Sequence, residues 1–234
     1  MLFFLIIGCI LLVFFVIYAL IPSFLTRVFE IRSTNHLRKS HSSIALTFDD
    51  GPNPTYTPII LDLLKSHSIK ATFFVLGSEA ENNPTIIKRI HEEGHLIGIH
   101  NYFHTCSWFL SPKVLHKQIE KTAKIIKELT KAEPNYYRPP WGLVSLPIFF
   151  QRKYNTILWT VMAYDWNSKQ GSKGILERLV KNAKPGSIIL LHDNGKTLGA
   201  DEDAPLNTIE ALESFITYCQ EKQYQFVRVD EFKS

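Results

Sequence analysis

The stretch "SSIALTFDDGP" at residues 42–52 joins a strand pattern to two adjacent carboxylates. The apolar and β-branched residues of 42–48, bounded by polar residues, predict a strand. Because alternate side chains of a strand share a face, Thr47 and Asp49 point to the same side, which we expect to be the interior. The Gly-Pro pair that follows breaks the strand and lets Asp50 turn toward the same edge. The stretch therefore predicts a strand that ends in a polar site.

Strand and helix patterns alternate on both sides of this stretch. Strands are predicted at residues 42–48, 70–77, 95–99, 156–161, 187–192 and 224–229, and helices at 57–67, 83–94, 111–131, 174–183 and 205–222. Alternation of this kind is typical of an α/β fold with a parallel sheet. About seven units with few insertions favour a distorted, partly irregular (β/α) barrel, TIM-like with about seven strands, over an open sheet.

Composition and charge exclude several classes of protein. The 234 residues suffice for one domain with a real core, and 45% hydrophobic against 21% charged residues excludes a disordered chain. Residues 1–40 carry four basic side chains and one acidic, and the other 194 residues carry 22 and 21. This balance gives no electrostatic footprint for nucleic acid. The three cysteines do not suggest a disulfide scaffold.

The first 21 residues are apolar and uncharged. About 20 residues of helix rise roughly 30 Å, the thickness of the hydrocarbon core of a membrane. A cleaved signal peptide would have a charged start and a small-residue cleavage site, and neither is present. We therefore predict a transmembrane anchor over 1–21 that ends at Pro22, a juxtamembrane linker over 22–41, and one domain over 42–234.

Ionisable side chains recur where the predicted strands and extended runs end. They are Asp49, Asp50, His100, Arg138, Asp165 and His192. In a (β/α) barrel the carboxyl ends of the strands share one rim, where active sites assemble. Each of these groups is costly to desolvate, so six of them on one rim indicate a site.

Two histidine pairs have the i,i+4 spacing of a metal site. His91 and His95 belong to "HEEGH", which fits the zincin pattern only on an unbroken helix. Gly94 between them is expected to end the helix, so we reject this pair. His100 ends an apolar strand, and a helical turn after it would aim His104 at the same point on the rim.

Five motifs then carry a resemblance. "TFDDGP", the H-x-x-x-H pair, "RPPWG" (138–142), "DW" (165–166) and "LLHD" (190–193) stand in the order of the motifs of NodB-homology polysaccharide deacetylases, carbohydrate esterase family four. The chain resembles this family over roughly 42–232. The resemblance identifies it as a divergent, membrane-anchored member, with residues 42–234 as the deacetylase catalytic domain.

The resemblance implies that Asp50, His100 and His104 bind one divalent metal. Zn²⁺ is the first expectation, with Co²⁺, Mn²⁺ and Ni²⁺ as alternatives. Two imidazoles, one carboxylate and an open position for water are typical of a catalytic zinc site. The metal would lower the pKa of its bound water and polarise the oxygen of the scissile amide.

The remaining roles also follow from the resemblance. Asp49 is expected to be the general base, oriented by an ion pair with Arg138. His192 is expected to be the general acid, kept protonated by Asp165.

Three further residues are expected to bind the substrate. A backbone N–H near Trp141 would hold the oxyanion, and Trp166 and Leu190 would line an apolar slot for the acetyl methyl. Asn101 and Met162 depart from the usual family residues, which puts the substrate specificity in question before the chemistry.

The predicted function is metal-dependent hydrolysis of N-acetyl groups in a polysaccharide that contains N-acetylglucosamine, such as peptidoglycan, a chitin-like polymer or an exopolysaccharide, with release of acetate. The alternatives are an O-acetyl esterase, an amidase for another acylated substrate, and a catalytically weak sugar-binding relative. Two histidines and a carboxylate are also the ligands of non-haem iron oxygenases, but those enzymes need no base and acid such as Asp49 and His192.

The expected partners are an acetylated glycan and, through the N-terminal helix, a membrane. Cations that follow the apolar segment favour a cytoplasmic domain, whereas a wall glycan requires an extracytoplasmic one. Because large domains translocate regardless of a few flanking charges, we expect a single-pass protein of the cell membrane with its catalytic domain outside. A monomer is expected.

Overall fold

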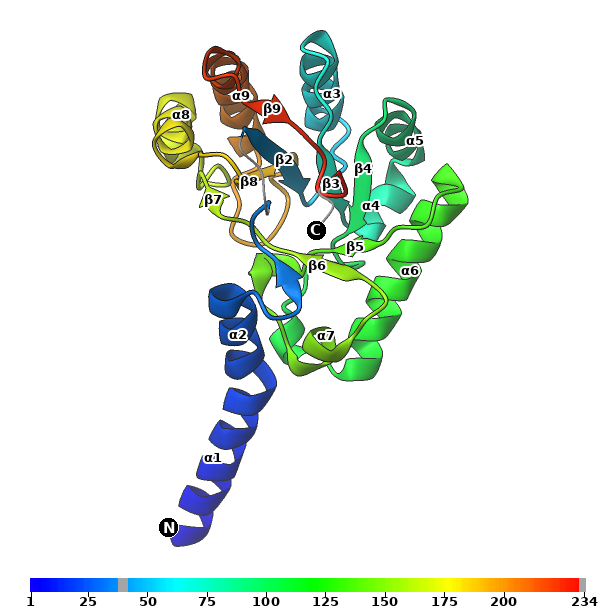
Figure 1. The fold of residues 1–234 in the computed structure, drawn as a ribbon. Helices are drawn as coiled ribbons and strands as arrows, with labels where there is room; N and C mark the ends of the chain where they lie inside the picture. The colour runs from blue at the N-terminus through cyan, green and yellow to red at the C-terminus, as the bar shows by residue number, and fades with distance from the viewer. Residues whose placement is uncertain (38–41, 232–234) are drawn as a thin grey trace.

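The computed structural model describes residues 1–37 and 42–231. Within these residues nine strands form one sheet, and every pairing between named strands is parallel (Figure 1). The strand order is β1-β6-β5-β4-β3-β2-β8-β7, and β9 pairs with the start of β2. The strands are β1 Ser33–Thr34, β2 Ser43–Asp49, β3 Thr72–Val75, β4 Leu96–Ile99, β5 Tyr136–Tyr137, β6 Asn155–Ile157, β7 Val161–Met162, β8 Ile188–His192 and β9 Gln225–Phe226.

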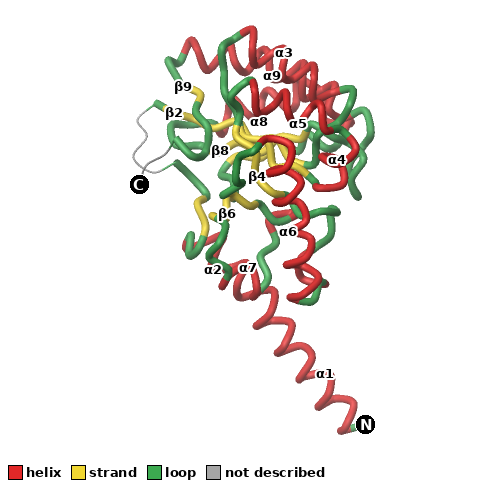
Figure 2. Tube along the Cα trace, turned by 90° about the vertical axis from the view of Figure 1, so that its right-hand side faces the viewer, coloured by secondary structure: helices red, strands yellow, loops and turns green. Residues whose placement is uncertain are grey.

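Helices surround the sheet and extend beyond it toward the N-terminus (Figure 2). The α-helices are α1 Leu2–Phe15, α2 Ile21–Phe29, α3 Tyr56–Ser66, α4 Gly77–Asn82, α5 Pro84–Glu92, α6 Pro112–Thr130, α7 Leu146–Phe150, α8 Gly171–Asn182 and α9 Ala204–Glu221. Shorter turns are the π-helix η1 Val16–Leu20 and the 3₁₀ helices η2 Ser107–Phe109, η3 Pro140–Gly142 and η4 Ser168–Gln170.

The sheet is curled but not closed. Along the hydrogen-bonded order, β1 and β7 stand at opposite edges and do not pair with each other in the described residues. Several strands are only two residues long, which limits the hydrogen bonds available for closure. The fold is thus the predicted parallel α/β fold with an irregular, incomplete (β/α) barrel.

The core has one layer on each face of the sheet. Ile44, Leu46 and Phe48 of β2 belong to the larger cluster, which packs against the helices. Ala45 joins Phe74 and other side chains in a smaller cluster on the inner face. This confirms the predicted division of the strand into two faces, and it sends Asp49 toward the inner face at the strand's end.

The strand register aligns the polar strand ends. Asp49 is the Cα partner of His192 in β8, so these two residues are neighbours across the ladder. Ile99 is likewise the partner of Tyr137, which places the residues that follow them, His100 and Arg138, side by side. Because parallel strands present their carboxyl ends at one edge, the register gathers these side chains at the mouth of the barrel.

One helix among the described residues, Leu2–Phe29, is long and apolar enough to cross a membrane. It comprises α1, η1 and α2 and leaves the domain beyond α2 and α7 (Figures 1 and 2). The expectation that Pro22 ends the helix is wrong, because the chain stays helical to Phe29. Pro22 has no N–H to donate, and the wider π-turn just before it accommodates that loss within a continuous helix.

The segment expected as a linker contributes to the fold up to residue 37. In it, β1 pairs with β6, and Leu37 is buried in the inner core cluster. Residues 38–41 of the expected linker lie outside the described residues. The division of the chain into an anchor, a linker and a catalytic domain remains a prediction.

Candidate active site

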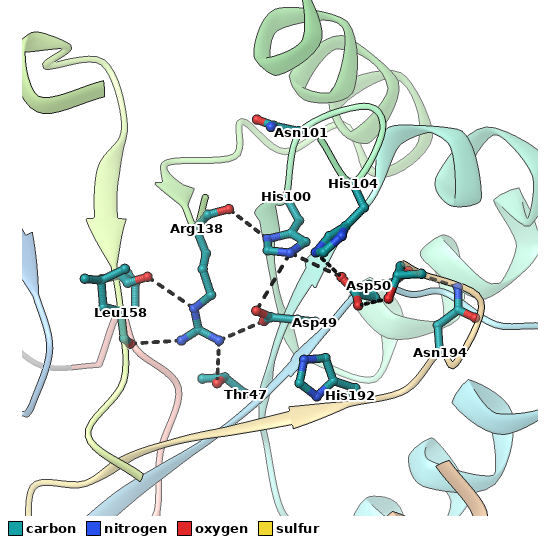
Figure 3. Close-up of polar contacts among 12 residues, drawn as sticks. Thr47, Asp49, Asp50, His100, Asn101, His104, Arg138, Leu158, His192 and Asn194 are labelled. Carbon is teal, nitrogen blue, oxygen red and sulfur yellow. Dashed lines mark hydrogen bonds and ion pairs between the residues drawn. The ribbon is translucent and has the colours of Figure 1, made fainter. Parts of the chain in front are cut away.

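Three side chains that could bind a metal converge at the mouth of the barrel (Figure 3). Asp50 Oδ1 lies 3.2 Å from His100 Nε2 and 3.3 Å from His104 Nε2. The three ligand atoms lie within 4.8 Å of one another, and no other such group of His, Cys, Asp or Glu occurs in residues 1–37 and 42–231. The structure therefore brings together the three residues predicted as metal ligands.

The donor set fits a divalent cation. Asp50 Oδ1 is buried and has no hydrogen-bond partner, whereas Oδ2 accepts a hydrogen bond of 2.7 Å from Thr197. His100 Nδ1 donates to the carbonyl oxygen of Arg138 over 2.7 Å, which leaves its Nε2 lone pair toward Asp50. A ligating histidine usually makes such a bond with its second nitrogen, because the bond fixes the tautomer and the ring orientation.

The electrostatics of the site favour the protonation states that a metal requires. Burial raises the pKa of Asp50, but the surrounding histidines outweigh it and hold that pKa below its usual range. Burial lowers the pKa of His104 to about 4, although the Asp50 carboxylate acts in the opposite direction. A charged carboxylate and a neutral imidazole are the forms that bind cations.

The backbone at two of these positions is left-handed. Asp50 has a φ of 78° and Asn101 a φ of 62°, a region that Asp and Asn enter more readily than most residues. The Asn101 side chain accepts from the Tyr137 hydroxyl over 2.9 Å and donates to the carbonyl of Thr105 over 3.3 Å. Asn101 thus closes the loop between the two histidines, which accounts physically for its presence there.

Asp49 and Arg138 form a buried ion pair beside this group. Arg138 Nη1 donates to Asp49 Oδ1 over 2.7 Å, and Arg138 has no exposed surface. Asp49 Oδ2 lies 3.9 Å from His100 Nε2, on the side of the candidate metal group. The predicted pairing of Asp49 with Arg138 is therefore present.

His192 and Asp165 form a second pair across the cavity. The two oxygens of Asp165 accept from His192, one from Nδ1 over 2.9 Å and one from the backbone N–H over 2.7 Å. Thr208 adds a hydrogen bond of 3.1 Å to the same carboxylate. Burial alone would lower the pKa of His192, but Asp165 outweighs it and raises that pKa to about 9. The protonated form of His192 is therefore favoured at neutral pH.

A cavity of about 260 Å³ opens between these two pairs. The three residues predicted to bind substrate, Trp141, Trp166 and Leu190, all line it. Its apolar lining also includes Trp159, Met162 and Leu198. Polar groups thus meet on an otherwise apolar wall, which is typical of sites for small ligands.

Three residues of this site were not predicted from the sequence. They are Thr197, which donates to Asp50, and Trp159 and Leu198, which line the cavity. Asn194 Nδ2 donates to the carbonyl of Asp50 over 3.1 Å, although "DNG" can also be read as a simple turn. Only the position of Asn194 directly after a predicted strand end could have indicated this contact.

The rejected histidine pair is confirmed as separate from the site. Helix α5 ends at Glu92, and Gly94 has a φ of 83°, so the zincin helix is not formed. His95 is buried, and its Nδ1 accepts from the backbone N–H of Ala71 over 3.0 Å. His91 remains exposed. The two rings therefore do not form a metal site.

Comparison with known proteins agrees with this geometry. A peptidoglycan-N-acetylglucosamine deacetylase of Bacillus cereus is 38% identical over 193 residues, which cover 80% of this chain and 86% of that protein. The peptidoglycan-N-acetylglucosamine deacetylase of Listeria monocytogenes is also 38% identical, over 82% of this chain, but the match spans only 39% of that longer protein. A crystal structure of a peptidoglycan N-acetylglucosamine deacetylase in complex with 4-naphthalen-1-yl-N-oxidanyl-benzamide superimposes with a TM-score of 0.80 at 33% identity, covering 88% of this chain and 95% of that one.

The sequence model of one family matches this chain directly. It is described as "Polysaccharide deacetylase" and matches residues 36–154, which contain Asp49, Asp50, His100, His104 and Arg138. The chain therefore belongs to the polysaccharide deacetylase family.

Proposed function

We propose that this protein is a metal-dependent deacetylase that hydrolyses the N-acetyl group of N-acetylglucosamine residues in a glycan and releases acetate. The observation that carries the proposal is the convergence of a candidate metal group, Asp49 and His192 on one cavity. The names of the relatives, which are peptidoglycan deacetylases, support the choice of an acetylated glycan.

Asp50, His100 and His104 would hold the cation, for which Zn²⁺ is our first choice and Co²⁺, Mn²⁺ or Ni²⁺ are alternatives. A divalent cation bound there supplies Lewis acidity, which polarises a carbonyl and lowers the pKa of water. The unpartnered oxygen of Asp50 and the fixed tautomer of His100 support this role.

Asp49 acts as the general base. One of its oxygens is engaged by Arg138, and the other, Oδ2, is on the side of His100. This carboxylate accepts a proton from the attacking water while the new C–O bond forms. Arg138 is a positioning residue, because its fixed guanidinium holds the carboxylate in one orientation.

His192 acts as the general acid. Its pKa of about 9, raised by Asp165 against the opposing effect of burial, keeps it protonated at neutral pH. When the C–N bond breaks, this imidazolium donates its proton to the leaving amine of the sugar. Acetate and a free amino sugar are the products.

Three residues around the cavity bind the substrate. A backbone N–H near Trp141 stabilises the oxyanion that develops on the acetyl oxygen. Trp166 and Leu190 enclose the acetyl methyl, and their place in the cavity lining supports this role. The neighbouring Met162 shapes the same wall and contributes to the choice of glycan.

The apolar N-terminal helix anchors the protein in the cell membrane, with the domain on the extracytoplasmic side. A substrate in the cell envelope requires this orientation. We propose that the protein acts as a monomer, because the metal group, the base and the acid all come from one chain.

Acetate release from a panel of acylated substrates tests the proposed function. The panel contains peptidoglycan, chitin oligomers, an N-acetylated exopolysaccharide, O-acetylated xylan and a simple acyl amide, each assayed with and without a chelator. We expect acetate from an N-acetylglucosamine glycan and loss of turnover with chelator, with Asp50→Ala and with His192→Ala. Release from xylan alone would make the protein an esterase, and release from the simple amide alone would make it an amidase. No release at all would leave a sugar-binding relative.

A further inference from the structure

The apolar helix is packed against the domain rather than tethered to it. Tyr18 donates its hydroxyl to the carbonyl of Leu110 over 2.6 Å, and the ring of Phe15 packs edge-on against Trp108. Further along, Ser23 Oγ donates to the carbonyl of Val144 over 2.8 Å. These bonds fix the direction of the helix relative to the barrel.

All of these contacts are made by segments that leave the carboxyl ends of strands. Leu110 belongs to the segment that follows β4, and Val144 to the segment that follows β5. The Arg27 guanidinium stacks 4.3 Å from the ring of Trp159, which follows β6 and also lines the cavity. The helix therefore docks at the end of the barrel that holds the candidate active site.

The part of the helix that is free of the domain is too short to cross a bilayer. Residues 2–14 are exposed, and burial against the domain begins at Phe15. Thirteen residues of helix rise about 20 Å, whereas the hydrocarbon core is about 30 Å thick. A helix that spans the core must therefore draw the mouth end of the domain about 10 Å into the bilayer, and a tilted helix would draw it deeper.

Exposed apolar side chains also occur on segments that follow strand ends and on α7, beside α2. Outside residues 1–31, the four most exposed large apolar residues of the described chain are Leu198, Phe109, Phe150 and Phe103, at 82%, 77%, 64% and 57%. Phe103 and Phe109 follow β4, Leu198 follows β8, and Phe150 ends α7, which contacts α2. Large exposed apolar side chains on one surface are typical of membrane or protein contacts.

We propose that the mouth end of the barrel rests in the bilayer interface, with Phe103, Phe109, Phe150 and Leu198 inserted, and that the substrate is an acylated saccharide carried by a membrane lipid. Continuity of this surface with the membrane-spanning helix favours a bilayer over a protein partner. A sugar attached to a lipid headgroup would meet the cavity at the membrane surface, whereas a distant wall polymer would not. The lipid-borne substrate rests on the proposed function, whereas the bilayer surface does not.

The depth of the mouth end of the barrel in the bilayer tests the proposed membrane surface without an activity assay. The full chain with Cys9→Ala and Cys106→Ala receives one cysteine, Phe109→Cys or Lys65→Cys, for labelling with an environment-sensitive fluorophore. Lys65 is exposed near the end of α3, away from the mouth, and is the matched control. The protein is reconstituted in vesicles of phosphatidylethanolamine and phosphatidylglycerol that carry a quencher on the acyl chains.

We expect the label at position 109 to be quenched several-fold more than the label at position 65. Equal and weak quenching at both positions would overturn the bilayer surface. Protection of position 109 from an aqueous quencher without quenching by the lipid would also overturn it, because a protein partner would then cover the rim.

The substrate class is tested with one N-acetylglucosamine disaccharide in two forms, free in solution and coupled to a lipid in the same vesicles. We expect faster acetate release from the lipid-borne form, and loss of that preference in the Phe109→Ser/Phe150→Ser double variant. Release from the free form should stay unchanged in this variant and in Lys65→Ser. Equal rates on both forms in the unsubstituted protein would overturn the lipid-borne substrate, whereas no acetate from either form would contradict the proposed deacetylase while the labelling result still stands.

Discussion

Arg138 and Asp49 form an ion pair inside the barrel, in which Nη1 of the arginine lies 2.7 Å from Oδ1 of the carboxylate. The guanidinium also donates to Thr47 Oγ1 over 2.8 Å and to the carbonyls of Ile157 and Leu158 over 3.1 and 3.0 Å. Its three nitrogens are thus all engaged, and the ring of Phe74 lies 4.2 Å from the guanidinium carbon. The planar guanidinium of Arg138 thus connects β2, β6 and the Asp49 carboxylate. A lysine, with a single ammonium group, cannot reproduce this geometry.

Arg138→Met should destabilise the protein by about 3–5 kcal/mol, because it leaves the buried Asp49 charge without its partner. Arg138→Lys should retain more stability, but both variants should lose acetate release because Asp49 is no longer oriented. Urea unfolding and the acetate assay measure the two effects. Arg152→Met, at an exposed arginine, is the control and should change stability by less than about 0.5 kcal/mol. An Arg138→Met protein as stable as this control would contradict a structural role for the pair.

Asp165→Asn should move the alkaline limb of the pH–rate profile. The acid form of His192 predominates below its pKa of about 9, so we expect kcat/KM to fall as the pH rises through that value. Asp165 raises this pKa against the effect of burial, and its neutral replacement should therefore shift the fall to lower pH. The profile of kcat/KM against pH for both proteins measures the shift. An unchanged alkaline limb would mean that His192 is not the proton donor.

Much of the fold was predictable because its central strands are continuous apolar runs. The predicted strands at 42–48 and 187–192 match β2 and β8 closely, and the long helices α6 and α9 begin and end within a few residues of prediction. The two-residue strands β1 and β5 and the short helices α4 and α7 were missed, because elements of that length carry no measurable periodicity. The continuation of the first helix past Pro22 was missed because it depends on the π-turn before the proline, and no local sequence pattern predicts a π-turn.

The residues of the candidate site also fall into predictable and unpredictable ones. Asp49, Asp50, His100 and His192 stand at the ends of recognisable strands, so their position in the sequence was enough to predict that they lie together. Thr197 lies five residues beyond β8 in an irregular segment, and its hydrogen bond to Asp50 depends on how that segment folds back. The need for glycine at position 51 also depends on the folded arrangement, because a Cβ there would lie 2.2 Å from the Asp193 carboxylate.

His104→Ala should reduce the binding of a divalent cation and abolish its stabilising effect. A cation that binds only the folded protein raises Tm, and it does so more the tighter it binds, so Zn²⁺ should raise the Tm of the unsubstituted protein and not that of the variant. Thermal unfolding with and without Zn²⁺, together with elemental analysis, measures this without any substrate. His91→Ala removes the exposed histidine of α5 and should respond to Zn²⁺ like the unsubstituted protein. Equal Tm shifts in both variants would place the cation elsewhere.

Thr197→Val should weaken the cation site without unfolding the protein. Thr197 donates to Asp50 Oδ2 over 2.7 Å, which holds the other oxygen, Oδ1, toward the two histidines. Loss of such an orienting hydrogen bond typically lowers metal affinity about 10–100-fold, while the similar shape of valine preserves the packing. Competition with a chromophoric chelator measures the affinity for Zn²⁺, and Tm without metal verifies the fold. Thr217→Val, at an exposed threonine of α9 that bonds only within its own helix, is the matched control and should leave the affinity unchanged. Equal affinities in both variants would show that the Asp50 carboxylate needs no second partner to hold its orientation.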